Sequence, residues 1–314
     1  MIPVIDCEDS LSLHCDEIWS AIESVGFVYL KNPELDRQLV DNALALSKQF
    51  FSSPCEVKSK VKRDSSSKTN SGYVGAGTET LSFSLDSTAK LNHVELRESY
   101  NVTVSENVNW PDADLPALKP GLLELIASCQ NVLRKLLTIV CSNIYPQDPA
   151  LMNKCHSMLC KTGNASALRI LHYPPVPDDN DEGEPRLGEH SDYGSLTLLF
   201  QDSIGGLEVM NREGEYIPAK PEPNAVLVNA GDLMEIWTGG KVKAVKHRVL
   251  TPERGSQSRN KHRMSIVFFG HPDDNVTVEP LVPFSDQKYT PVNAKSYLDM
   301  KFAATYESNR SLNK

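Results

Sequence analysis

The chain has 314 residues, 40% of them hydrophobic, which is enough apolar material for one large domain or two closely packed ones. Its formal net charge is -9 and its pI is about 5.4, and no long run of Lys or Arg interrupts the acidic balance. Proteins that bind nucleic acid through its phosphates need a basic surface, so we expect no nucleic-acid partner.

The same survey predicts neither a membrane span nor an export signal. No stretch approaches the ~20 apolar residues that cross a bilayer, and the first residues lack the basic and apolar regions of a signal peptide. The seven cysteines are scattered, odd in number and without a C-x-x-C pair, which favours reduced thiols. We therefore expect a cytoplasmic protein, with nuclear localisation also compatible, and we expect it to be a monomer without a membrane partner.

The first residues predict short strands alternating with helices. Residues 3–6 and the apolar residues 27–30 are predicted strands. Between them, apolar side chains recur at near-helical spacing over residues 11–25, and Gly26 can end that helix in a left-handed turn. A second amphipathic helix is predicted over residues 35–50, with its apolar stripe in the core.

The composition changes at residues 62–80, where Ser, Gly and Thr dominate and no apolar period survives. This predicts a loop, and within it residues 65–80 form either a lid or an ordinary surface loop. Residues 98–102 then predict a strand, residues 115–145 a long helix, and residues 148–158 a further helix.

From residue 167 onward the chain predicts short strands joined by tight turns, followed by a closing helix over residues 294–306. The predicted strands are residues 167–175, 225–228, 233–237, 245–249 and 263–269. Gly205-Gly206 marks one of the turns. Residues 178–185 form an acidic run whose spacing fits no EF-hand, so we expect a solvated loop.

Many short antiparallel strands, with helices only before and after them, predict an α+β fold with a double-stranded β-helix, or jelly-roll, core. The expected organisation is a mostly helical N-terminal region, residues 1–150, packed on the barrel of residues 151–314.

An H-x-D pair within residues 187–209 is the first candidate for chemistry. In extended backbone, residues i and i+2 point to the same side, so His190 and Asp192 converge while Ser191 faces away. His247, in the predicted strand over residues 245–249, supplies a third ligand. Two imidazoles and one carboxylate leave the opposite face of a metal open, as non-haem iron(II) oxygenases require. An H-x-D pair alone is common, so further evidence is needed.

That evidence comes from a second polar pair, Arg263 and Ser265. Both share one strand face with Val267 and Phe269, which places a guanidinium fork beside a hydroxyl. This combination suits a carboxylate. A metal triad followed by a carboxylate clamp indicates a metal-chelating acid as cosubstrate.

These segments resemble the iron(II)- and 2-oxoglutarate-dependent dioxygenases, in the soluble plant and fungal branch that includes isopenicillin N synthase. The resemblance rests on HSDYGSLTLLFQDSIGGLEV, NAGDLMEIWTGGKVKAVKHRV and HRMSIVFFGHPD, which keep the family order over about the last half of the chain. It implies that the catalytic residues His190, Asp192 and His247 hold iron(II). It also implies an oxidoreductase that consumes dioxygen, decarboxylates 2-oxoglutarate to succinate, and hydroxylates or desaturates a small molecule.

The cosubstrate site that the resemblance implies contains Arg263, Ser265 and Tyr173, and it departs from the family at one position. The family has an Asn and a Tyr on the first core strand; Tyr173 matches the Tyr, whereas Leu171 stands at the Asn position. Leu171 keeps open an iron oxidase of the isopenicillin N synthase type, which works without 2-oxoglutarate and uses the Arg-x-Ser pair for a substrate carboxylate. A non-catalytic binding barrel and a zinc hydrolase are further alternatives. The intact triad argues against a non-catalytic barrel, and the lack of a well-placed general base argues against a zinc hydrolase.

The remaining candidates are side chains near the expected site. Phe269 shares the face of Ser265 and is a candidate aromatic contact for the substrate, with a packed core ring as the alternative. Trp237 and four histidines without a partner at metal-ligand spacing are expected to be structural. These histidines are His93, His156, His262 and His271. The substrate itself is not predicted.

Overall fold

The computed structural model describes residues 1–64, 71–78, 95, 97–104, 108–176, 185–282 and 289–312. For residues 306–312 it describes only the backbone. Most of the predicted acidic loop and His93 lie outside these residues. So do residues 65–70 and 79–80 of the segment proposed as a lid.

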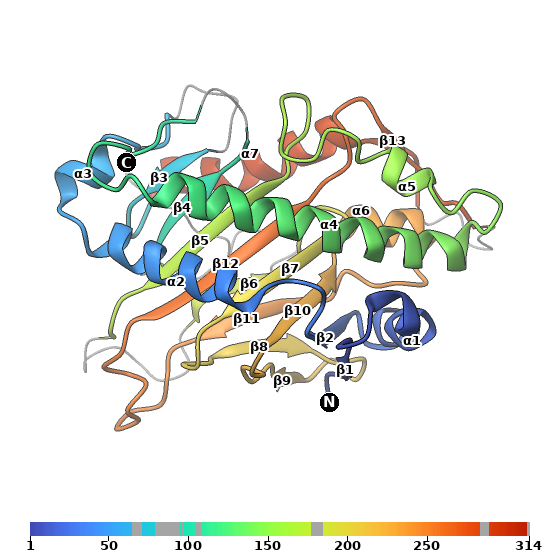
Figure 1. Ribbon diagram of the computed structural model, residues 1–314, viewed down its shortest axis with the longest axis horizontal. Coiled ribbons are helices and arrows are strands. Elements are labelled where there is room, and N and C mark those ends of the chain that lie inside the picture. The colour runs from blue at the N-terminus through green and yellow to red at the C-terminus, as the bar shows by residue number, and fades with distance from the viewer. Residues whose placement is uncertain are drawn as a thin grey trace.

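Two β-sheets face each other (Figure 1). The larger has the spatial order β1 (Val4–Asp6), β2 (Phe27–Lys31), β10 (Ala225–Ala230), β7 (Leu196–Gln201), β12 (Arg263–Gly270), β5 (Ala167–Tyr173), β4 (Glu98–Val102) and β3 (Gly72–Val74). The smaller has the order β6 (Pro185–His190), β11 (His247–Leu250), β8 (Leu207–Met210) and β9 (Tyr216–Pro218). Neighbouring strands are antiparallel except for β1 and β2. This arrangement confirms the predicted α+β jelly-roll core.

The N-terminal region is part of the larger sheet as well as a cover for it. β1 and β2 extend the sheet beyond β10, and β3 and β4 extend it beyond β5. The helices of this region are η1 (Leu11–His14), α1 (Cys15–Val25), α2 (Arg37–Ser52), α3 (Cys55–Ser59) and α4 (Leu118–Ile144). The later elements are α5 (Leu151–Lys154), α6 (Asp232–Trp237), β13 (Thr277–Val278), β14 (Val292–Asn293) and α7 (Ala294–Leu312).

The long helix α4 lies across the larger sheet beside α2 and contacts β7 and β12 (Figure 1). Among the helices in the described part of the chain, only α4 is long and apolar enough to cross a membrane. The prediction that no segment is apolar over the length of a membrane span was therefore wrong. Residues along α4 such as Leu125, Leu133 and Val140 are fully buried, so its apolar character belongs to a core helix.

Strand alternation divides the core into two layers. On β12, Ile266 and Phe268 belong to the cluster shared with the helices, whereas Val267 packs with Leu171 and Leu187 between the two sheets. Every second residue of this strand therefore faces the interior of the barrel. Arg263 and Ser265 are in phase with Val267 and must face the same interior.

The predicted helix end at Gly26 and the predicted structural roles of Trp237 and His156 are confirmed. α1 ends at Gly26, whose φ of 77° lies in the left-handed region and whose N–H donates to the Ile22 carbonyl. A Cβ on Gly26 would lie 2.5 Å from Cγ2 of Val245, so the site also requires a residue without a side chain. Trp237 is buried in the core, and His156 is fully buried with hydrogen bonds to the Met152 carbonyl and Ser195, as predicted for structural residues.

Three predicted elements were wrong. The predicted strand over residues 233–237 is the helix α6, because an apolar run this short fits both periods. The helix predicted over residues 148–158 shrinks to the single turn of α5. Residues 72–74, predicted as loop, form β3 because Tyr73 packs its ring against Phe50 and Phe51, contacts that local composition does not reveal.

A partly buried polar cluster around Glu98 predicts a change in acid stability. The Glu98 carboxylate accepts hydrogen bonds from Lys58 at 2.8 Å and from the Tyr73 hydroxyl, and it lies 3.1 Å from Nδ1 of His172. Burial raises the pKa of Glu98, but the hydrogen bonds from these three groups outweigh it and hold the pKa at about 2, below the ordinary 4.5. The stabilisation is therefore complete above about pH 4.5 and is lost as pH falls toward 2.

We expect Glu98→Gln to lower the melting temperature most above pH 4.5, with a difference from wild type that shrinks as the pH falls. Thermal unfolding between pH 3 and pH 8 measures this, and Glu213→Gln, at an exposed turn, is the control. A loss of the same size at every pH would show that the charge of Glu98 does not contribute.

Candidate metal and cosubstrate site

His190, Asp192 and His247 converge on a cavity between the two sheets. His190 ends β6, Asp192 follows in the next loop, and His247 begins β11 directly opposite His190 in the antiparallel register. The two imidazole centroids are 4.2 Å apart. One ligand atom from each of the three residues lies within 4.8 Å of the others. The predicted convergence is confirmed, although Asp192 lies just beyond the strand.

Backbone carbonyls set the orientation of both histidines. Nδ1 of His190 is 2.8 Å from the Gly188 carbonyl, and Nδ1 of His247 is 3.2 Å from the Val245 carbonyl. A proton on each Nδ1 donates to these carbonyls and leaves the lone pair of each Nε2 for a metal. Both rings therefore have the tautomer that metal binding requires.

The third ligand is oriented by side chains inside the barrel. Nδ2 of Asn229 donates to Oδ2 of Asp192 at 2.6 Å, and Oδ1 of Asp192 lies 3.8 Å from Nε2 of His247. Burial raises the pKa of Asp192, but His247, His190 and hydrogen bonds from Asn229 and Thr197 outweigh it and keep the pKa below its usual value. Burial, with His247 beside it, lowers the pKa of His190. A carboxylate beside a neutral imidazole is the ligand state that a metal requires.

The segment between the ligands is held from outside the barrel. The Ser191 hydroxyl donates to Oδ1 of Asp232 at 2.8 Å, although Ser191 also lines a cavity together with His190 and Asp192. Oδ2 of Asp232 accepts from the Tyr297 hydroxyl at 2.8 Å and pairs with Nζ of Lys301 at 2.9 Å. The Asp232 N–H also donates to the Asp192 carbonyl at 2.8 Å. Helices α6 and α7 thus fix the backbone of the metal-ligand loop.

Arg263 and Ser265 line the same cavity as the triad, and Tyr173 faces Arg263 in the register of β5 and β12. Arg263 is fully buried, with 1% of the residue exposed. Its Nε donates to the Gly205 carbonyl at 2.8 Å, and its two terminal nitrogens lie 3.4 Å from Ser265 Oγ and from Oε1 of Gln201.

All these partners of Arg263 are neutral. No carboxylate of the described residues pairs with it, and the buried Tyr173 hydroxyl has no hydrogen-bond partner among them. A buried guanidinium next to an unpartnered hydroxyl needs an anionic ligand that brings several acceptor oxygens. The residues of this cavity therefore fit a metal together with a carboxylate ligand.

The structure adds residues that sequence reasoning missed. Arg97, Arg169, Thr197 and Asn229 also line the cavity. The sequence could have indicated Asn229 as a site residue, because it is the one polar residue in the apolar strand β10. Leu171 faces the cavity as well, without a polar atom to replace the Asn of the family pattern.

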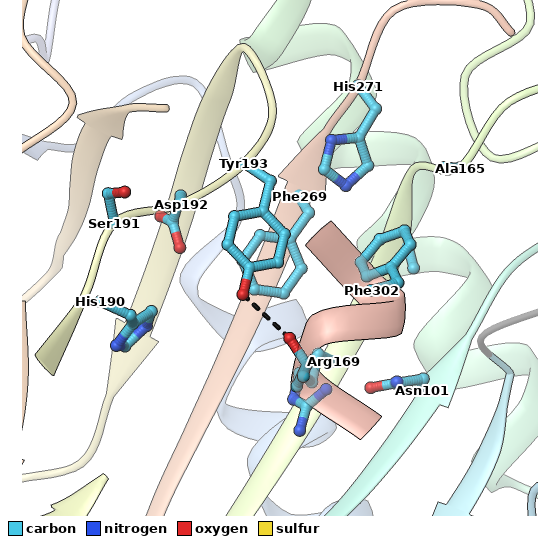
Figure 2. Close-up of a pocket in the computed structure, with 12 residues that line it drawn as sticks. Asn101, Ala165, Arg169, His190, Ser191, Asp192, Tyr193, Phe269, His271 and Phe302 are labelled. Carbon is cyan, nitrogen blue, oxygen red and sulfur yellow. Dashed lines mark hydrogen bonds between the residues drawn. The ribbon is translucent and has the colours of Figure 1, made fainter. Parts of the chain in front are cut away.

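A second cavity adjoins the triad and contains the other predicted contact (Figure 2). Phe269, the candidate aromatic contact for the substrate, lines both cavities. His271, which we expected to be structural, also lines the second cavity and stacks on Phe269 with ring centroids 6.2 Å apart.

Comparisons with known proteins agree with this geometry. Residues 164–272 match the model of the 2OG-Fe(II) oxygenase superfamily, and residues 2–119 match the model described as non-haem dioxygenase in morphine synthesis N-terminal. The 2-oxoglutarate-Fe(II) type oxidoreductase ppzD of Metarhizium majus is 31% identical, over 93% of this chain and 89% of that protein. Proline hydroxylase buaE of Petromyces alliaceus is 30% identical, over 84% of this chain and 83% of that protein.

Among solved structures, a full-length Neurospora crassa protein in complex with alpha-KG and thymine matches with a TM-score of 0.79 and 28% identity, covering 97% of both chains. These relatives decide against the alternatives without 2-oxoglutarate, without catalysis or with zinc. The chain belongs to the 2OG-Fe(II) oxygenase superfamily, and it is an iron(II)- and 2-oxoglutarate-dependent dioxygenase.

Proposed function

We propose that His190, Asp192 and His247 hold the iron(II) of this enzyme and that Arg263, Ser265 and Tyr173 hold the distal carboxylate of 2-oxoglutarate. The observation that carries the proposal is the buried Arg263, which has only neutral partners beside the unpartnered Tyr173 hydroxyl. A carboxylate there accepts two parallel hydrogen bonds from the guanidinium and one from a neighbouring hydroxyl.

We further propose hydroxylation of a small molecule as the reaction. Iron(II) with 2-oxoglutarate supplies the oxidation of a C–H bond by dioxygen, with carbon dioxide and succinate as coproducts. The chain itself contributes orientation and exclusion of water: Arg263 fixes one end of the cosubstrate, and Leu171 and Val249 line the cavity with apolar surface. The relatives named as a proline hydroxylase and solved with thymine support a small-molecule substrate.

Localisation, oligomeric state and macromolecular partners are the subject of a further proposal. We propose a cytoplasmic monomer that binds neither nucleic acid nor membrane. The net charge of -9 supports the first exclusion, and the burial of α4 in the core supports the second. Light scattering of the purified chain measures its oligomeric state.

Succinate formation tests the proposed function. Purified protein with iron(II) and 2-oxoglutarate should form succinate only when both are present, and a true substrate should increase the rate and appear as its hydroxylated product. A protein that oxidises its substrate at full rate without any 2-oxo acid would overturn the assignment of Arg263 to the cosubstrate.

A further inference from the structure

The orientation of Tyr173 depends on contacts of its ring. Its hydroxyl is buried and has no hydrogen-bond partner among the described residues. The ring, in contrast, meets two guanidinium groups. The guanidinium carbon of Arg263 lies over the ring at 4.8 Å from its centroid, and that of Arg186 lies over it at 5.2 Å. Arg263 lines the cosubstrate cavity, whereas Arg186 is not among the described residues that line it.

Arg186 reaches Tyr173 from the opposite sheet. It lies on β6 in the smaller sheet, whereas Tyr173 ends β5 in the larger one. A terminal nitrogen of Arg186 also donates to the carbonyl of Pro174, the residue after Tyr173. Arg186 is 3% exposed, so both contacts are shielded from water. One buried side chain therefore holds the backbone after Tyr173 and a face of its ring.

The charge of Arg186 strengthens its contact with the ring. No carboxylate in the described part of the chain pairs with Arg186, whose hydrogen bond goes to a neutral carbonyl. Burial, and to a smaller extent repulsion from Arg263, lowers the pKa of Arg186 to about 10, so the side chain remains charged at neutral pH. A cation is attracted by the negative face of an aromatic ring, and this attraction increases when water is excluded. The contact between Arg186 and Tyr173 should therefore resist reorientation of the ring.

We propose that Arg186 is a positioning residue for the cosubstrate, because it holds the ring of Tyr173 so that the hydroxyl points at the distal carboxylate of 2-oxoglutarate. The inference rests on the proposed function, which assigns Tyr173 to that carboxylate. Without a ligand the hydroxyl has no described partner, so contacts of the ring orient it before 2-oxoglutarate binds. A hydroxyl that is oriented in advance loses less freedom on binding, which increases the affinity for the distal carboxylate.

A comparison of two 2-oxo acids tests this role. 2-Oxopentanoate has the chelating end of 2-oxoglutarate but lacks the distal carboxylate. In isothermal titration of the anaerobic iron(II) protein, Arg186→Met should raise the Kd for 2-oxoglutarate by about three- to thirtyfold, the range that cation–π contacts span. The Kd for 2-oxopentanoate should not change, which also shows that the variant is folded. Arg186→Lys keeps the charge and should recover part of the affinity for 2-oxoglutarate.

The control is Arg248→Met, the same change at another guanidinium that lies over a tyrosine ring. The guanidinium carbon of Arg248 is 3.8 Å from the centroid of the Tyr216 ring, and its removal should leave the Kd for both acids unchanged. Equal weakening of both acids in Arg186→Met would show that Arg186 has a structural role only, and would overturn the proposal.

A double-mutant cycle with Tyr173→Phe tests whether Arg186 acts through the hydroxyl. Tyr173→Phe keeps the ring and removes the hydroxyl, so by itself it should weaken 2-oxoglutarate binding. Adding Arg186→Met to Tyr173→Phe should then have little further effect, because no hydroxyl remains to be oriented. A full effect of Arg186→Met in the Tyr173→Phe background refutes the inference, as does an unchanged Kd in Arg186→Met alone. A wild-type protein that does not bind 2-oxoglutarate, or a Tyr173→Phe variant that binds it as tightly as wild type, refutes the proposed function instead.

Discussion

Replacing Asp192 with alanine is expected to abolish iron-dependent succinate formation while the fold remains intact. Asp192 is the one anionic ligand of the triad, and its loss leaves two neutral imidazoles facing a divalent cation. Changes to residues that merely support ligands cost about ten- to a hundredfold in metal affinity or activity. Loss of the ligand itself should therefore reduce turnover by more than about a hundredfold.

The iron content of the purified variant, its succinate production and its thermal unfolding separate these effects. Asp41→Ala removes an exposed carboxylate that pairs with Arg37 on α2, and it serves as the control. Iron content and succinate production equal to wild type in Asp192→Ala would remove the basis for the metal site.

Changing Arg263 to lysine is expected to raise the Kd for 2-oxoglutarate by about ten- to a hundredfold with little change in iron affinity. Lysine keeps the charge but loses the planar fork that engages a carboxylate through two parallel hydrogen bonds. Charge-assisted hydrogen bonds contribute about 1.5–3 kcal/mol, which corresponds to this range of affinity. The loss of affinity for 2-oxoglutarate should be large because no described carboxylate pairs with Arg263 in place of the cosubstrate.

Titration with 2-oxoglutarate measures the effect. The control is Arg248→Lys, since Arg248 is bonded to Glu208 away from the barrel interior. A variant Arg263→Lys that binds 2-oxoglutarate as tightly as wild type would mean that another group holds the distal carboxylate.

The predictable part of this site depends on local periodicity. His190 and Asp192 are two residues apart, as are Arg263 and Ser265, and strand alternation alone places each pair on one face. The prediction of His247 as the third ligand required only that one more strand and the family pattern be recognised. Tyr173 and the departure at Leu171 followed from the same pattern, and both side chains line the cavity.

The unpredicted part depends on contacts between distant segments. Tyr193 meets Thr305 across 112 positions of sequence, and Arg169 reaches the second cavity only because β5 lies beside β4 and β12. No local pattern specifies such pairings. The wrong strand at α6 has a different cause, since a short apolar run fits both a helix and a strand. There the amides of Asp232 and Leu233 donate to carbonyls of the metal-ligand loop, a reason for helix formation that lies outside the segment.

Visible absorption during an anaerobic titration tests the central claim most directly. When 2-oxoglutarate is added to the protein loaded with iron(II), chelation by its carboxylate and keto oxygens gives a metal-to-ligand charge-transfer band. We predict a band that saturates at one 2-oxoglutarate per chain, needs a higher concentration in Arg263→Lys, and is absent in Asp192→Ala. Absence of the band in wild type at saturating 2-oxoglutarate, or its persistence in Asp192→Ala, would contradict the account.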